Sequence, residues 1–169
     1  MSIHRPARTS TRLGVGAASV ALVLGVAAPA LAASTVRTDP ADASGSLSDL
    51  RRVAVDHGPN AVRVNVTFTD LQPTSEAGPA GMAIYLDTKP GRKGPEFRLD
   101  TGLQSGTDYQ LTRARKWAPV GEPLSCSHRL KLDFDADVAR FRVLRSCLGD
   151  PETVRVAVKI FFLLIRRPP

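Results

Sequence analysis

Aromatic residues, cysteines and histidines are scarce in this chain of 169 residues, and each scarcity excludes a class of function. One Trp and two Tyr are too few for an extended platform on which sugar rings could stack. Cys126 and Cys147 are too far apart in the sequence to form a catalytic C-x-x-C pair. Beyond the amino-terminal region the histidines are His57 and His128, and neither has a potential metal ligand three or four residues later.

Catalytic sequence motifs are missing as well. The chain contains no G-x-S-x-G elbow, P-loop, H-E-x-x-H motif or dinucleotide-binding fingerprint. Two acidic residues could still meet in space as a catalytic pair, but nothing in the sequence selects such a pair. We therefore expect a protein that is not an enzyme, with an unrecognised hydrolase as an open alternative.

The amino-terminal region has the three parts of an export signal. Basic residues between Arg5 and Arg12 precede an apolar run over residues 13–28, and small residues follow as far as Ala32. This order predicts a secretory signal peptide over residues 1–32 that is cleaved after Ala32. The apolar run is too short to span a bilayer, so we expect no stable membrane anchor. The basic residues include no adjacent arginine pair, which favours the general secretory route and a secreted, extracellular protein.

The charge of the chain depends on this signal. The formal net charge is +7, and removal of Arg5, Arg8 and Arg12 with the signal lowers it to +4. A surplus of this size gives no reason to expect a nucleic-acid partner.

Residues 161–169 read Phe-Phe-Leu-Leu-Ile-Arg-Arg-Pro-Pro, a string that resembles translated adapter read-through. We interpret it as a tail that is not native to the protein. The alternative is a last strand with a basic end.

Between the two ends, apolar residues recur with a period of two. In residues 60–69, Val62, Val64, Val66 and Phe68 share one face, and the same pattern recurs in residues 82–87 and 153–160. Weaker strand candidates are residues 52–56, 96–100 and 108–113, and residues 130–134 and 139–143 read as a hairpin. Seven or eight short strands with turns between them predict an all-β fold, an antiparallel β-sandwich over residues 49–160.

The hairpin predicts a disulfide bond. The apolar pattern pairs Phe134 with Ala139 and Leu132 with Phe141, and the same register continues to Cys126 and Cys147. Opposed strand residues lie within disulfide range, and an exported protein meets an oxidising compartment. We therefore predict a Cys126–Cys147 disulfide bond, with two buried free thiols as the alternative.

Two acidic clusters invite comparison with calcium sites. Asp133, Asp135 and Asp137 begin like a calcium loop, but the later glycine and glutamate are missing, so we interpret them as a solvated hairpin tip. Residues 33–48 form an acidic amino-terminal segment, and with the adjacent Asp49 this region offers Asp39, Asp42 and Asp49 as candidate calcium ligands. The alternative is a disordered linker with incidental acids.

Several segments together carry a family resemblance. Residues 48–53 (Ser-Asp-Leu-Arg-Arg-Val), 84–88 (Ile-Tyr-Leu-Asp-Thr), 94–97 (Gly-Pro-Glu-Phe) and 145–151 (Arg-Ser-Cys-Leu-Gly-Asp-Pro) follow one another in a familiar order. In this order the chain resembles exported actinobacterial proteins of unassigned function. More distantly it resembles the β-sandwiches of family 9 carbohydrate-binding modules and DOMON-like domains.

The resemblance implies two kinds of site. Some relatives have a D-x-x-G-D segment associated with calcium, but here Pro40 and Ala41 separate Asp39 from Asp42 and the glycine is absent. Sugar-binding relatives stack aromatic rings on their ligand, which makes Trp117, in a predicted loop, the candidate ligand-binding residue; a lone Trp can instead plug a core or an edge.

The sequence therefore predicts a secreted, non-enzymatic β-sandwich module that binds an extracellular glycan, a cell-wall polymer or a protein. The first alternative is a structural exported domain that calcium stabilises.

Overall fold

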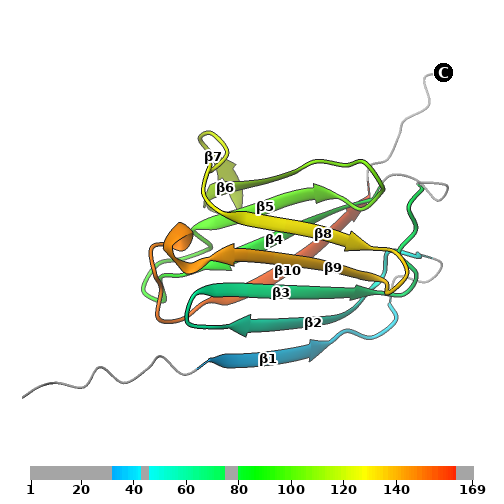
Figure 1. Cartoon of the computed structure of the whole chain (residues 1–169), viewed down its shortest axis with the longest axis horizontal. Coiled ribbons are helices and arrows are strands. Elements are labelled where there is room, and N and C mark those ends of the chain that lie inside the picture. Colours follow the sequence, from blue (N-terminus) through cyan, green and yellow to red (C-terminus); the bar gives the residue numbers. More distant parts are fainter. Residues whose placement is uncertain (1–31, 43–45, 75–79, 163–169) are drawn as a thin grey trace, which may run out of the picture.

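Two five-stranded antiparallel sheets pack face to face as a β-sandwich, which confirms the predicted fold class (Figure 1). The fold is seen in a computed structural model, which describes residues 32–42, 46–74 and 80–162. The first sheet consists, in spatial order, of β1 (Ala33–Thr38), β2 (Leu50–His57), β3 (Ala61–Phe68), β9 (Val138–Leu144) and β8 (His128–Asp133). The second sheet consists, in spatial order, of β10 (Arg155–Phe162), β4 (Ala80–Asp87), β5 (Phe97–Gly102), β6 (Tyr109–Arg115) and β7 (Ala118–Val120).

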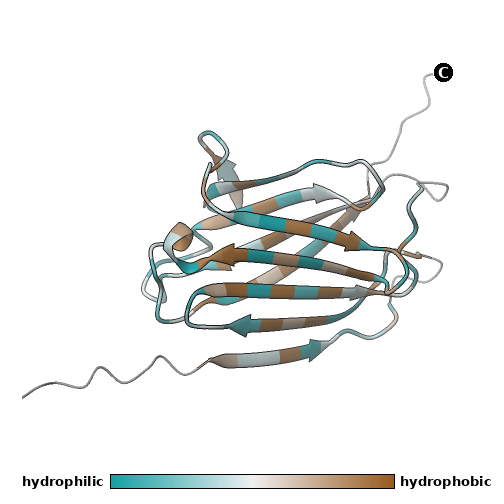
Figure 2. Ribbon diagram, in the orientation of Figure 1, coloured by the Kyte–Doolittle hydropathy of each residue, from teal (hydrophilic) through white to brown (hydrophobic). Residues whose placement is uncertain are grey.

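The core lies between the two sheets and follows the period of two. In β3, Val62, Val64 and Val66 are fully buried, whereas Arg63 and Asn65 between them are exposed. Successive side chains of a strand point to opposite faces, so the valines face the second sheet and the polar residues face solvent. The hydropathy colouring in Figure 2 shows this alternation along the strands of the first sheet.

Strand β4 departs from simple alternation because both of its faces are buried. Met82, Ile84 and Leu86 belong to the core, and Ala83 and Tyr85 on the outer face are also buried, with Tyr85 only 7% exposed. Something must therefore cover the outer face of the second sheet next to Tyr85. The side chain that covers it is that of Trp117.

The structure contains ten strands in its described residues rather than the seven or eight predicted. The two that the sequence pattern missed are β1 and β7, and every residue of both is exposed. Without a buried face, neither strand shows alternation of apolar and polar residues, so periodicity could not reveal them.

The structure describes only part of the two predicted terminal segments. The predicted signal peptide lies outside the described residues except for Ala32, which precedes β1. Strand β1 occupies the start of the segment expected to be an acidic amino-terminal stretch. Strand β10 continues two residues beyond the predicted end of the domain, and Phe161 lies so close to Gly81 that a Cβ at residue 81 would overlap its ring. Residues 163–169 lie outside the described residues.

The predicted register of the β8–β9 hairpin is wrong by two residues. Leu130 pairs with Phe141, and Leu132 pairs with Ala139, whereas the apolar pattern had opposed Leu132 to Phe141. A slip of two keeps every side chain on its predicted face, so the pattern could not detect the error. Phe134 lies in the turn instead of pairing with Ala139.

The turn itself selects the observed register. Asp137 has a positive φ of 54°, and its backbone oxygen accepts a hydrogen bond from the Phe68 N–H at 2.9 Å. Its side-chain Oδ1 accepts a second one from the Leu71 N–H at 2.8 Å. These bonds tie the turn to the segment that follows β3.

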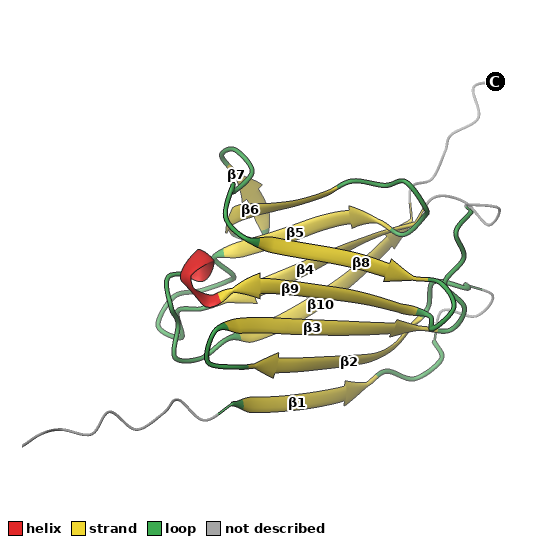
Figure 3. Cartoon of the chain, in the orientation of Figure 1, coloured by secondary structure: helices red, strands yellow, loops and turns green. Residues whose placement is uncertain are grey.

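The Cys126–Cys147 disulfide bond forms nonetheless, with the two Cα atoms 5.6 Å apart. In the observed register Cys126 would oppose Arg145 rather than Cys147. After β9 the chain turns into a short 3₁₀ helix, η1 (Arg145–Leu148), drawn in red in Figure 3, and this turn brings Cys147 back towards Cys126. No helix in the described part of the chain is long and apolar enough to cross a membrane.

We expect the disulfide bond to contribute about 3 kcal/mol to the free energy of unfolding, because it closes a loop of 21 residues in the unfolded chain. The double substitution Cys126→Ala and Cys147→Ala is expected to lower the unfolding free energy by this amount in urea denaturation. Thiol titration of the denatured, unreduced protein is expected to find no free cysteine, and two reactive thiols would contradict the bond.

Candidate functional site

A strained two-residue turn joins β6 to β7 and carries Trp117 at its tip. Arg115 pairs with Ala118, so Lys116 and Trp117 alone make the connection. Their φ angles are +51° and +70°, the left-handed conformation that a tight hairpin of this kind requires at both positions. Asn and Gly normally fill such turns, because larger side chains cost about 1 kcal/mol or more there.

Trp117 covers the outer face of β4 from this turn. Its ring meets the ring of Tyr85 edge to face, with the centroids 4.9 Å apart and the planes at 70°. The Arg98 guanidinium lies 5.4 Å from the centre of the Tyr85 ring and donates a hydrogen bond to the Trp117 carbonyl oxygen at 3.1 Å. Trp117 is still 52% exposed, so about half of its surface remains available to a ligand.

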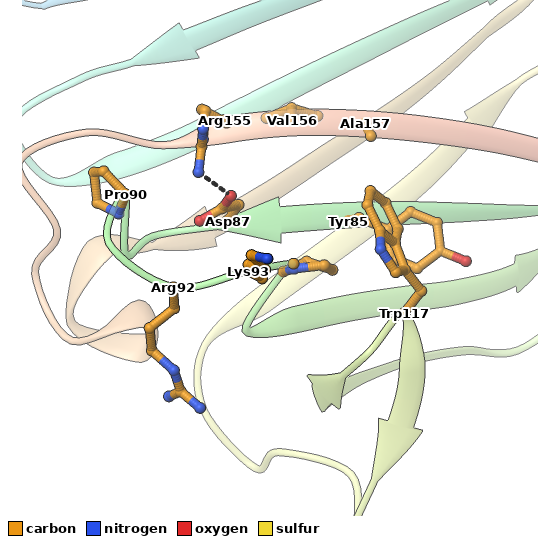
Figure 4. Close-up of a pocket in the computed structure, with 11 residues that line it drawn as sticks. Tyr85, Asp87, Pro90, Arg92, Lys93, Trp117, Arg155, Val156 and Ala157 are labelled. Carbon is orange, nitrogen blue, oxygen red and sulfur yellow. Dashed lines mark hydrogen bonds and ion pairs between the residues drawn. The ribbon is translucent and has the colours of Figure 1, made fainter.

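A cleft of about 500 Å³ opens beside this tryptophan (Figure 4). Its floor is the outer face of the second sheet, where Ala157 of β10 pairs with Tyr85 and Arg155 pairs with Asp87. Its other wall is the loop between β4 and β5, whose lining residues are Pro90, Arg92, Lys93, Gly94 and Pro95. The volume lies within the range of small-molecule sites.

The loop that forms this wall is fixed at both of its ends. The buried carboxylate of Glu96 accepts hydrogen bonds from the Thr88 N–H at 2.8 Å and from the Thr88 hydroxyl at 3.3 Å. Within the loop the Arg92 N–H donates to the Lys89 carbonyl oxygen at 2.9 Å. Gly94 has φ +86°, and a Cβ built there would lie 3.7 Å from the indole nitrogen of Trp117.

The carboxylate that lines the cleft, Asp87, and that of Asp100 are both engaged in ion pairs. Asp87 forms an ion pair with Arg155 at 2.6 Å, drawn as a dashed line in Figure 4, and accepts a hydrogen bond from the Lys89 N–H at 3.3 Å. On the neighbouring strand, Asp100 forms an ion pair with Arg98 at 2.5 Å. Arg92 and Lys93 are exposed, and neither forms an ion pair with any residue that the structure describes.

The sequence identified one residue of this site and missed its neighbours. Trp117 was predicted to bind a ligand from a loop, and the structure places it in a tight turn beside the cleft. Tyr85 and Asp87 could have been found from the alternation in β4, which puts them together on the outer face. No local signal links them to Trp117 or Arg155, because those residues arrive from other strands.

The predicted calcium ligands lie around a second, smaller cavity of about 350 Å³. Asp39, Asp42 and Asp49 all line it, and Lys159 of β10 lines it too. Asp49 is 6% exposed and lies 3.3 Å from the Arg51 guanidinium. The three carboxylates do not form a group whose oxygens lie within 4.8 Å of one another, so this arrangement brings them near one another without completing a coordination shell.

The acidic tip of the β8–β9 hairpin is a network of hydrogen bonds and ion pairs. Asp133 pairs with Arg140, and the hydrogen bond from Arg140 holds the pKa of Asp133 below its ordinary value. Lys131 lies 3.9 Å from the same carboxylate, and the Ala136 N–H donates to it at 3.3 Å. Since Asp137 accepts a hydrogen bond from the Leu71 N–H, Asp133 and Asp137 both have structural roles.

The two histidines have different surroundings. The His57 Nε2 atom is buried and has no hydrogen-bond partner among the residues that the structure describes. The His128 Nδ1 atom lies 2.7 Å from the Cys126 carbonyl oxygen, and the ring meets Tyr109 edge to face. His128 also lies within 4.8 Å of the sulfur atoms of Cys126 and Cys147, but these are joined in the disulfide bond and offer no thiolate to a metal.

We compared the chain with models of protein families, with curated proteins and with solved structures, and none of these comparisons gave a match. The fold class and the site geometry therefore carry the functional argument.

We expect Lys116→Gly to raise the free energy of unfolding by about 0.5 to 1 kcal/mol, because Gly adopts positive φ without a steric penalty. The matched control is Ala118→Gly, two residues later, where the backbone has no positive φ and Gly is expected to destabilise the protein. Urea denaturation of the three proteins measures both effects. If Lys116→Gly destabilises the protein as much as Ala118→Gly does, the turn is not strained.

Proposed function

We propose that this chain is a secreted, non-catalytic β-sandwich module that binds an extracellular glycan in the cleft beside Trp117. The observation that carries the proposal is a half-exposed tryptophan held in a strained turn above a cleft. Backbone strain is found preferentially at functional sites, where the surrounding structure holds it in place. An aromatic face beside polar groups is the arrangement to which the apolar face of a sugar ring binds.

Three further observations support this function. The turn, the Tyr85 contact and the hydrogen bond from Arg98 fix Trp117 before any ligand arrives, so that little conformational entropy is lost on binding. The predicted signal sequence and the disulfide bond are typical of exported proteins, and glycans are abundant outside cells. The resemblance to exported sandwiches and to carbohydrate-binding modules points in the same direction.

We expect the protein to bind a subset of glycans on an array, and its tryptophan fluorescence to change on binding, because Trp117 is its one Trp. Trp117→Asn removes the ring but tolerates the left-handed backbone, and it is expected to weaken binding at least about tenfold in calorimetry, or about 1.4 kcal/mol.

The control is Arg129→Gln, an exposed substitution on the first sheet that leaves the turn and the ring unchanged and is expected to keep the affinity for neutral glycans. No binding to any glycan, with fluorescence that no sugar changes, would contradict the proposed function.

A second candidate role is stabilisation of the amino-terminal region by calcium. The observation that favours it is that Asp39, Asp42 and Asp49 line one cavity beside β10, although Lys159 shares it. Calcium prefers oxygen ligands in flexible geometry, and three carboxylates around one cavity supply that kind of ligand.

This role predicts that millimolar Ca²⁺ raises the melting temperature of the protein and that Asp42→Ala removes the rise. Mg²⁺ at the same concentration is the control for general screening of charge. A melting temperature that does not respond to Ca²⁺, or that responds equally in Asp42→Ala, would contradict it.

A further inference from the structure

Among the free polar side chains of the cleft, cationic donors outnumber acceptors. Asp87 is engaged by Arg155 and by the Lys89 N–H, and the Trp117 carbonyl oxygen accepts from Arg98. The donors left for a ligand are the Arg92 guanidinium, the Lys93 ammonium and the indole N–H of Trp117, which donates to no described residue. The acceptors left on the lining side chains are the remaining lone pairs of Asp87 and the Tyr85 hydroxyl. Arginine, lysine and tryptophan side chains donate hydrogen bonds and accept none.

A lining rich in cationic donors and poor in acceptors fits a ligand group that only accepts. A neutral sugar presents hydroxyl groups that both donate and accept, and in this cleft few acceptors face their protons, chiefly the Asp87 carboxylate that Arg155 already engages. A carboxylate or a phosphate group only accepts, and its bonds to Arg and Lys are about twice as strong as bonds between neutral groups.

The two free cations lie on a loop that is held in place. Pro90 and Pro95 restrict its backbone, and Glu96 fixes its neck through the two bonds to Thr88. Figure 4 shows Arg92 and Lys93 on this loop, with Trp117 and Tyr85 on the other side of the cleft. The Arg92 side chain extends from the loop away from Trp117 in Figure 4, and because Arg92 and Lys93 are both exposed, a change of rotamer lets them reach a ligand that lies on the tryptophan face.

We infer that the glycan is anionic: the cleft binds a saccharide whose ring stacks on Trp117 while Arg92 and Lys93 bind its carboxylate or phosphate group. This inference rests on the proposed glycan-binding function and adds the chemical class of the ligand. A nucleic acid would also offer phosphates and flat rings. Two free cations and a single exposed tryptophan, however, fall short of the basic track and repeated aromatic rings that single strands require.

The test compares four probes by the fluorescence of Trp117 at low salt. These are an oligogalacturonate, its neutral methyl ester, a poly(glycerol phosphate) bearing sugars, and a single-stranded oligonucleotide. We expect the oligogalacturonate or the phosphate polymer to bind about tenfold more tightly than the methyl ester, and added salt to remove the difference. Which of the two polymers binds better distinguishes a carboxylate ligand from a phosphate ligand.

The variant Arg92→Gln/Lys93→Gln is expected to lose this preference about tenfold, while its affinity for the methyl ester stays the same. The matched control is Arg129→Gln/Arg142→Gln, which removes two exposed charges from the outer face of the first sheet and is expected to keep the preference. If both double variants lose the preference for the anionic probe equally, the preference arises from the net charge of the protein and not from Arg92 and Lys93, and the inference is overturned.

Failure of the inference and failure of the proposed function give different results. If the methyl ester binds as tightly as the acid and Trp117→Asn abolishes both, the glycan site stands and the anionic class is wrong. If the oligonucleotide binds at least as tightly as the saccharides, the ligand class is wrong. If no saccharide binds, the proposed function itself fails.

Discussion

Burial of the valine face of β3 against the second sheet is the interaction on which the rest of this structure depends. Val62, Val64 and Val66 are fully inaccessible to solvent, and complete burial of such side chains contributes about 1.5 to 3 kcal/mol each. Because strand side chains alternate, the same burial directs every second residue outwards. The strands of the second sheet alternate in the same way, and on the outer face of that sheet Tyr85, Asp87 and Arg155 line the cleft beside the tip of the β6–β7 turn.

Much of the fold follows from the sequence because it depends on periodicity, which is a local property. Eight of the ten strands coincide with predicted segments, and β1 and β7 escaped because neither has a buried face. The register of β8 against β9 could not be predicted, since registers that differ by two residues place the same side chains inside. Asp137 selects between them through its contacts with Phe68 and Leu71, residues distant in the sequence.

The disulfide bond illustrates how a correct prediction can rest on an incomplete argument. The opposed strands bring Cys126 and Cys147 into the same region, but it is η1 that closes the final gap. The candidate site, too, could be predicted only in part from the sequence. Trp117 stood out as the sole Trp, whereas its partners Tyr85, Arg98 and Arg155 come from three other strands, and only strand pairing places them beside it.

Strand β1 is held to the domain by backbone pairing with β2 and by little else. All six of its residues are exposed and none belongs to the core, so its detachment would leave the core between the two sheets in place. Elements with few buried contacts open locally at low free energy while the remainder stays folded. Force applied at the amino-terminal side would therefore peel this edge strand from β2 before it acted on the interior of the sandwich.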